Sequence, residues 1–340
     1  MKLIVTDVQN GGTSLLESEA VEPSTQRDYV RRLKVFDDFC TSTGLVVLPS
    51  SSDDTIELAA LDYLDHIFLL ELPIDAGTKF MAALAARWAR LHRPARSGRL
   101  PRLRRALQGF GRLNPASTRL PIPMVLVHAL AAVLTPHYYE AALLLLLAAD
   151  AYLRPGEVVD LSTDSVIPAQ NWLGQGYAMV TLLLHPAASG QMSKMHCFDD
   201  SVVLDSKSAP WLAPLVVKLA QQRGPGVPLF QFTAADMNKL IVAALMTLGL
   251  QDWDVTLYAM RHAGPSHDHL MKLRPLEEIQ RRGRWASMKS CRRYEKSSQI
   301  MSQLNKIPKS KLVFIRQASL DIAEILRGTV SPPFCVPIQK

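Results

Sequence analysis

The residues of this chain best suited to chemistry lie in its second half and combine guanidinium groups with a phenol. In sequence order they are Arg154, Lys194, Tyr258, Arg261, Trp285 and Tyr294. The stretch RRGRWASMKSCRRYEK (281–296) places Tyr294 among arginines, nine positions after Trp285 (294 − 285). Positive charge nearby stabilises the phenolate of a tyrosine, whose phenol otherwise has a pKa of about 10. The pattern therefore predicts a tyrosine that attacks a phosphate.

Attack on a phosphodiester builds negative charge on its non-bridging oxygens. Two planar guanidinium groups, here Arg154 and Arg261, can clamp such oxygens with paired hydrogen bonds that a lysine does not match. The leaving 5′-oxygen needs a proton, which we expect Lys194 to supply, with Lys207 across the same hairpin as the alternative. A phosphotyrosine bond at Tyr294 conserves the energy of the cleaved bond, so no ATP, metal ion or other cofactor is required.

The pattern around these residues predicts a mainly helical fold with one small β-sheet (α+β). The apolar run Ala141–Ala149 ends at Asp150 and is far shorter than the roughly 20 residues of a membrane span, so it indicates a buried helix leading into LRPGE. Residues 178–185 and 201–204 are expected to be strands around a polar turn. Residues 210–326 are expected to be mostly helical.

Changes in composition divide the chain into segments. The N-terminal residues are polar and lack periodicity, whereas amphipathic helices are expected from Ser24 to Gly44 and at about 55–72, 76–92 and 101–110. The stretch NPASTRLPIP contains three prolines and is typical of a linker. The predicted segments are a flexible arm (1–24), a helical DNA-binding domain (25–113), a linker (114–123), a catalytic domain (124–300) and a C-terminal tail (301–340).

The net charge of +7 comes from one segment. Between Arg87 and Arg119 there are ten arginines and no Asp or Glu, which leaves 28 Lys and Arg (38 − 10) against 31 Asp and Glu elsewhere. A block of like charge without internal partners favours an anionic ligand, and double-stranded DNA is the usual one; a solvated face without a ligand is the alternative. The expected DNA contacts are Arg87, Arg90, Arg93, Arg96, Arg99, Arg102, Arg104 and Arg105.

Other ligands and locations are disfavoured by composition. An apolar content of 48% excludes a disordered chain, and four scattered cysteines without a CxxC pair indicate neither disulfides nor zinc. His267 and His269 are two positions apart and would lie on different faces of a helix, so no metal site is expected. No targeting signal or membrane span is visible. We expect an intracellular protein that accompanies DNA, in the nucleus of a eukaryote or the cytoplasm of a bacterium.

Taken in order, these motifs resemble the tyrosine recombinase (phage integrase) family over residues 24–300. AADAYLRPGEVVDLSTDSV (148–166) resembles its first arginine box, and YAMRH (258–262) resembles the second, usually His-x-x-Arg-His. Gly283, Trp285 and Tyr294 match the third box, where the family has His or Trp at the position of Trp285. The β-hairpin lysine of the family maps onto SKMHCFDDSVVLD, which makes Lys194 the candidate.

The resemblance implies a site-specific recombinase or integrase that cleaves and rejoins DNA strands through a 3′-phosphotyrosine intermediate. It also implies a mobile element and a homo-tetramer on paired DNA sites. The tail after Tyr294 would pack either on a neighbouring subunit or within the chain. Tyr258 departs from the pattern because histidine is commoner there, and a phenol is not cationic near neutral pH.

Three alternatives remain at this point. Tyr258 favours a catalytically silent DNA-binding protein derived from a recombinase. A type IB topoisomerase-like enzyme shares the chemistry, although a helical N-terminal domain with a short linker favours the recombinase. An RNA-binding module has little support, because the sequence contains no aromatic-rich stretch of the kind that stacks on RNA bases.

Overall fold

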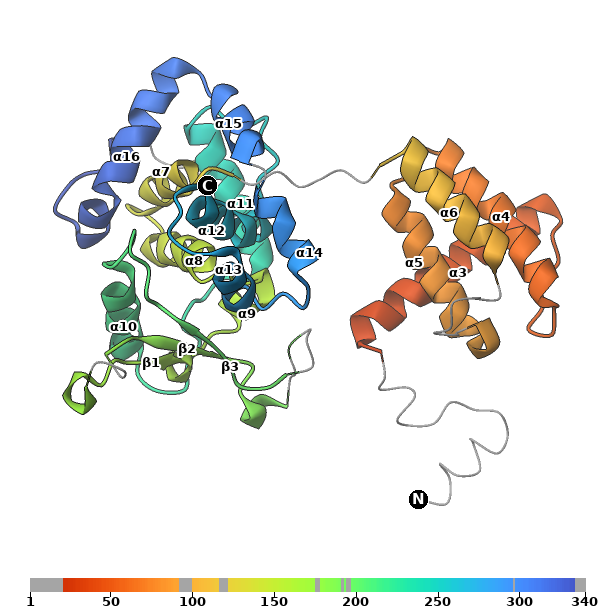
Figure 1. The fold of residues 1–340 in the computed structure, drawn as a ribbon, viewed down its shortest axis with the longest axis horizontal. Coiled ribbons are helices and arrows are strands. Elements are labelled where there is room, and N and C mark those ends of the chain that lie inside the picture. Colours follow the sequence, from red (N-terminus) through yellow and green to blue (C-terminus); the bar gives the residue numbers. More distant parts are fainter. Residues whose placement is uncertain are drawn as a thin grey trace. The chain divides into compact units, whose positions relative to one another are not determined.

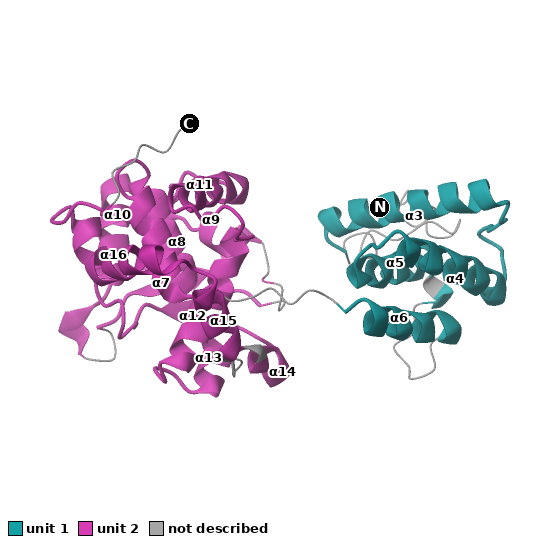
Figure 2. Cartoon of the chain, turned by 90° about the horizontal axis from the view of Figure 1, so that it is seen from above, with its two compact units in different colours: residues 1–118 teal, residues 119–340 magenta. Residues whose placement is uncertain are grey.

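The chain divides into two compact units, residues 1–118 (unit 1) and 119–340 (unit 2), which Figure 2 colours separately. The computed structural model describes residues 21–91, 100–115, 122–174, 178–190, 193, 197–295 and 297–333. The predicted arm therefore lies almost wholly outside the described residues, as do residues 116–121 of the predicted linker and 334–340 of the tail.

Unit 1 is a helical bundle around an aromatic core. The α-helices among its described residues are α3 (Pro23–Thr43), α4 (Asp53–Leu69), α5 (Ile74–Arg87) and α6 (Pro101–Leu113). They lie within a few residues of the expected helices. Phe36, Tyr63 and Phe80 meet at the centre, with ring centroids 5.4 Å apart for Phe36–Tyr63 and 4.6 Å for Tyr63–Phe80. Ring pairs at these separations add to the stability gained by apolar burial.

Unit 2 is built around α8 (Tyr139–Asp150), whose apolar run is buried as the sequence predicts. It packs against helices α7, α10 and α12, as seen at the centre of unit 2 in Figure 1. The other helices of this unit carry or surround the site residues. In chain order the α-helices are α7 (Met124–Leu134), α8, α9 (Pro155–Val159), α10 (Leu212–Arg223), α11 (Ala234–Thr247), α12 (Leu257–Leu270), α13 (Leu276–Arg282), α14 (Met288–Cys291), α15 (Ser297–Asn305) and α16 (Lys309–Arg327).

A three-stranded antiparallel sheet lies at the edge of unit 2 in Figure 1, with the order β1-β2-β3. Its strands are β1 (Val166–Ile167), β2 (Thr181–Leu184) and β3 (Asp200–Val203). Val166 pairs with Leu182, and Leu182 pairs with Val202. All three side chains are buried, so one face of the sheet joins the core. The sequence predicted β2 and β3 but not β1.

The C-terminal helix α16 packs along α7 and completes the core of unit 2. Ile315, Ala318, Ile322 and Ile325 of α16 are buried in this core. Leu320, by contrast, is 68% exposed. Helix α16 of the tail therefore packs within this chain. No described helix combines the length and the apolar character that crossing a membrane demands.

Candidate active site

The first arginine of the site is placed by the turn between α8 and α9. Tyr152 has a left-handed backbone conformation (φ 53°), which ends α8 and turns the chain toward Arg154. Arg154 is the N-cap of α9, and Pro155 occupies the first helical position, where its missing N–H costs no hydrogen bond. The backbone N–H of Arg154 donates to Oε2 of Glu157 (2.7 Å), so the side chain of the third helical residue satisfies the N-cap amide. The side chain of Arg154 is thus held beside Glu157.

The second arginine is placed by close packing of α12 on α8. A Cβ atom at Gly264 would lie 2.0 Å from the carbonyl oxygen of Ala149, so only glycine permits this approach. Arg261, about one turn earlier, is 2% exposed. Its Nη1 donates to the carbonyl of Tyr152, and its Nη2 donates to that of Gly283 (2.6 Å). Arg261 therefore connects α12 to the turn that carries Arg154.

The segment after α13 supplies Trp285 and Arg284. Arg282, the last residue of α13, anchors this helix because its guanidinium donates to the carbonyls of Val203 (2.6 Å) and Asp150 (3.0 Å). A Cβ atom at Gly283 would lie 1.8 Å from the Trp285 ring, so glycine lets the indole fold back over the backbone. The Arg261 guanidinium lies 4.9 Å from the centroid of the Trp285 ring, in a cation–π contact.

Glu157 is the buried carboxylate at the centre of an arginine cluster. Arg154 forms an ion pair with its Oε1, Arg284 donates to its Oε2 at 2.7 Å, and Arg261 lies 3.6 Å from Oε2. Burial by itself raises the pKa of Glu157, but Arg284 and the backbone N–H and guanidinium of Arg154 outweigh burial and hold that pKa at about 2. Burial, aided by Arg154, lowers the pKa of Arg261 to about 10.

The predicted nucleophile lies in a buried aromatic cluster next to the arginines. Tyr294 is in the short 3-10 helix η6 (Arg292–Glu295) and is 2% exposed. Its hydroxyl is hydrogen-bonded to Nδ1 of His262 at 3.0 Å. The ring of Trp285 lies 5.1 Å from that of Tyr294, and the Tyr258 ring meets the His262 ring edge-on at 5.3 Å. Arg261, Trp285 and Tyr294 thus form a continuous series of contacts.

This arrangement suits an anion. Three guanidinium groups and one carboxylate leave a net charge of +2 (3 − 1) in the cluster of Arg154, Arg261, Arg284 and Glu157. The Arg154 side chain is 17% exposed, which makes it the most accessible of the three arginines. Nε2 of His185, directly after β2, lies 3.7 Å from Oε1 of Glu157. A phosphate near Arg154 would meet excess positive charge.

The structure brings together five of the six predicted site residues. Arg154 and Arg261 belong to the arginine cluster, and Trp285 contacts Arg261. Tyr294 contacts Trp285, and Tyr258 contacts His262, which is bonded to Tyr294. Lys194 lies outside the described residues, in the connection between β2 and β3. Its alternative Lys207, which follows β3, is exposed and lines a small cavity with Asp205, Asp268 and Glu278.

Sequence reasoning missed two residues of the site, Arg284 and His262. Arg284 adopts a left-handed conformation (φ 54°) that directs its side chain back to Glu157, and nothing in its sequence neighbourhood indicates this. His262 adjoins Arg261 in the YAMRH motif, so its position was a signal that could have been used. Among the described residues, no group of three or more His, Cys, Asp or Glu side chains is arranged to hold a metal ion.

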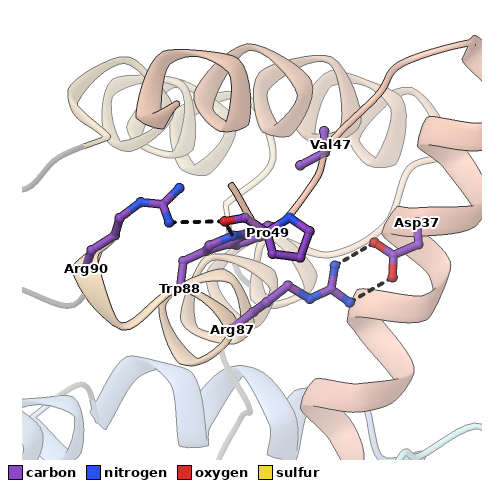
Figure 3. Close-up of a pocket in the computed structure, with 6 residues that line it drawn as sticks. All are labelled: Asp37, Val47, Pro49, Arg87, Trp88 and Arg90. Atoms are coloured by element: carbon purple, nitrogen blue, oxygen red, sulfur yellow. Dashed lines mark hydrogen bonds and ion pairs between the residues drawn. The ribbon is translucent and has the colours of Figure 1, made fainter. Parts of the chain in front are cut away.

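Part of the arginine block has carboxylate partners within unit 1 (Figure 3). Arg87 forms two hydrogen bonds to Asp37 (2.6 and 2.7 Å) beside a cavity of about 630 Å³. Arg90 also pairs with Asp53 (2.9 Å), which is not drawn in Figure 3. Residues 87–119 contain no acidic residue, but these two arginines have carboxylate partners elsewhere in unit 1. The reason is that helices α3 and α4 bring acidic residues from far earlier in the chain.

The arginines of α6 are arranged differently. Leu103 and Phe110 bury one side of this helix, while Arg102, Arg104 and Arg105 are exposed. Oε1 of the buried Glu57 accepts hydrogen bonds from the backbone N–H groups of Arg102 (2.8 Å) and Leu103 (3.1 Å), which fixes the start of the helix. No described carboxylate forms an ion pair with these three exposed arginines. Arg93, Arg96 and Arg99 lie outside the described residues.

Comparison with known proteins identifies the fold. No protein-family model matches the sequence, and no curated protein sequence matches it. The structure is similar to that of XerH site-specific recombinase bound to palindromic difH substrate in a post-cleavage complex, with a TM-score of 0.55 and 15% identity over 82% of this chain and 78% of that one. It is also similar to the Tn1549 transposon integrase (residues 82–397) in complex with transposon right end DNA, with a TM-score of 0.54 and 12% identity over 89% of this chain and 98% of that one.

Both proteins are tyrosine recombinases, so the chain has the mainly helical fold, with a small antiparallel sheet, of that class of enzymes. The resemblance that the three sequence boxes predicted is confirmed at the level of the fold.

Proposed function

We propose that this chain is a site-specific DNA recombinase or integrase that cleaves and rejoins strands through a 3′-phosphotyrosine intermediate. The observation that carries the proposal is the contact of Arg261 with Trp285 and of Trp285 with Tyr294, next to a cluster with net positive charge. The arginines and the phenol come from different elements, yet the fold assembles them within one site. The fold shared with DNA-bound recombinases supports the same reading.

Each residue has a distinct role in the proposed reaction. Arg154 and Arg261 hold the non-bridging oxygens of the phosphate, and Glu157 together with Arg284 fixes the orientation of these two guanidinium groups. Tyr294 attacks the phosphorus, which forms the phosphotyrosine bond and releases the 5′-oxygen. Lys194 is the proposed donor of a proton to that oxygen. The net charge of +2 matches the charge that develops on the phosphate during attack.

The proposed partner is double-stranded DNA, held in part by the exposed arginines of α6. A protein that neutralises phosphates with arginine gains affinity as counterions are released, and this affinity does not depend on sequence. By analogy with the class, we further propose a homo-tetramer on paired sites in a mobile element, within whichever compartment contains the DNA. Unit 1 would hold DNA, and unit 2 would carry out the chemistry.

A catalytically silent DNA-binding protein is the second candidate, because of two observations. Tyr258 replaces the more common histidine, and Tyr294 is buried with its hydroxyl bonded to His262. In that case the cluster would bind phosphate without attacking it. The two candidates differ in one measurable property, the formation of a covalent adduct.

Tyr294→Phe tests the proposal. On a nicked suicide substrate, from which the cleaved strand end diffuses away, the wild-type chain should accumulate a covalent protein–DNA adduct. The phenylalanine variant should form none while keeping nearly the same affinity for DNA, since one hydroxyl contributes little beside phosphate contacts. Adduct formation by the variant would remove Tyr294 from the role of nucleophile. An absence of adduct from the wild-type chain would favour the silent protein.

A further inference from the structure

His262 lies in direct contact with the atom that would attack the phosphate. Its Nδ1 is 3.0 Å from the Tyr294 hydroxyl, and both side chains are buried, with exposed fractions of 5% and 2%. The imidazole and phenol rings are 5.9 Å apart between centroids. Enclosure of this hydrogen bond away from water favours a fixed geometry for both groups.

Attack by a phenol requires that its proton leave. An imidazole is suited to accept that proton near neutral pH, whereas the guanidinium groups around the site have no lone pair to offer. A phenol that donates to Nδ1 requires the neutral tautomer with hydrogen on Nε2. Tyr258, which replaces a common histidine in the second box, cannot substitute for this function, since a neutral phenol is a poor proton acceptor.

We propose that His262 is the general base of the cleavage step, an inference that rests on the proposed function. As Tyr294 Oη forms its bond to phosphorus, the hydroxyl proton moves to Nδ1 of His262, which becomes an imidazolium. The bond between phosphorus and the 5′-oxygen breaks, and its electron pair stays on that oxygen, which takes a proton from Lys194. On rejoining, the imidazolium returns its proton to the departing Tyr294 oxygen.

The position of α12 supports this assignment. Arg261 and His262 are adjacent in sequence, and both side chains contact the aromatic cluster. They lie next to Gly264, where α12 packs closely against α8. One rigid element therefore sets both the guanidinium that holds the phosphate and the imidazole that contacts the phenol. A site on a helix holds such groups more accurately than a site on a loop.

His262→Asn is the test, because an asparagine oxygen near the Nδ1 position can accept the hydrogen bond but cannot take the proton. We expect single-turnover adduct formation to slow by about 100-fold or more, with DNA affinity unchanged. His269→Asn, the same substitution later on α12, is the matched control and should keep the wild-type rate. A rate for His262→Asn equal to that of the wild type would overturn the proposal.

A tyrosine analogue with a more acidic phenol at position 294 distinguishes two roles of His262, accepting the proton and positioning the phenol. With a fluorinated tyrosine at position 294, the reaction depends less on a base, so the ratio between the wild-type and His262→Asn rates should shrink. An unchanged ratio would show that His262 only orients the ring, which would overturn the proposal. If the wild-type chain forms no adduct at all, the proposed function itself fails, and this inference fails with it.

The wild-type protein also offers a test that does not depend on a variant folding. The ¹⁵N chemical shifts of His262 should show an unprotonated Nδ1 and a protonated Nε2, and the Nδ1 shift should change in Tyr294→Phe. A proton on Nδ1 would contradict the assignment, because that atom could not then accept the phenol proton.

Discussion

Glu157→Gln removes a buried negative charge from the arginine cluster while keeping the size of the side chain. The Glu157 side chain is 2% exposed and faces Arg154, Arg261 and Arg284. Loss of one partner from a buried ion pair typically destabilises a protein by about 3–5 kcal/mol, because uncompensated charge remains buried. The pKa shift of Glu157, from the ordinary 4.5 to about 2, corresponds independently to about 3 kcal/mol.

The effect should depend on pH in a defined direction. The folded-state pKa of Glu157 lies below its unfolded value, so its stabilisation is fully present above about pH 4.5 and is lost as the pH falls through 2. The difference between wild type and Glu157→Gln should therefore be about 3 kcal/mol at pH 7 and about half of that near pH 3. For a unit of this size, the neutral-pH difference lowers the melting temperature by roughly 6–12 °C.

Chemical and thermal unfolding of the full chain, followed at the transition of unit 2, measures this difference. Glu140→Gln is the matched control, since it breaks the pair with Arg223 in the same unit, where the Glu140 side chain is 32% exposed. That change should cost at most about 1 kcal/mol. Equal effects of the two substitutions, or a Glu157 effect that does not diminish on acidification, would refute the view that Glu157 neutralises the arginines.

Two further predictions concern DNA. Replacing Arg102, Arg104 and Arg105 with Gln should weaken binding to all duplex sequences alike and reduce the slope of log K against log salt by up to about 3. The control Arg87→Gln, which breaks a pair with Asp37, should leave that slope unchanged. An unaltered slope in the triple variant would mean that α6 does not face phosphate. Lys194→Ala should slow cleavage of an ordinary phosphodiester much more than cleavage of a 5′-bridging phosphorothiolate, whose thiolate leaves without a proton. Equal slowing on both substrates would exclude Lys194 as the proton donor and make Lys207 the candidate.

Local patterns in the sequence were enough to predict the main helices and two of the strands. The run Ala141–Ala149 is apolar on every side, which is sufficient to identify a central buried helix. Strand β1 has only two residues, too few for an alternating pattern to be visible. Helix α16 lies within the segment expected to be helical, but the helix on which it packs, α7, is distant in sequence and could not be deduced.

The same limit applies to the site. Arg154, Arg261 and Tyr294 were found through motif order, which needs only the sequence. The contact of Arg284 with Glu157 depends on a left-handed backbone conformation that non-glycine residues adopt rarely. The pair of Arg87 with Asp37 joins residues 50 positions apart. A count of charges within residues 87–119 alone therefore did not predict the environment of Arg87.

The packing of α16 on α7 has a consequence for the order in which the units form. Helix α7 is the first helix of unit 2 and α16 is the last, so the two ends of this unit close on each other. During synthesis, unit 1 has all of its helices available long before the core of unit 2 can be covered. A nascent chain would thus hold a folded helical bundle while the apolar face of α7 still lacks its partner. The core that supports the arginine cluster and Tyr294 is then completed only after synthesis has passed α16.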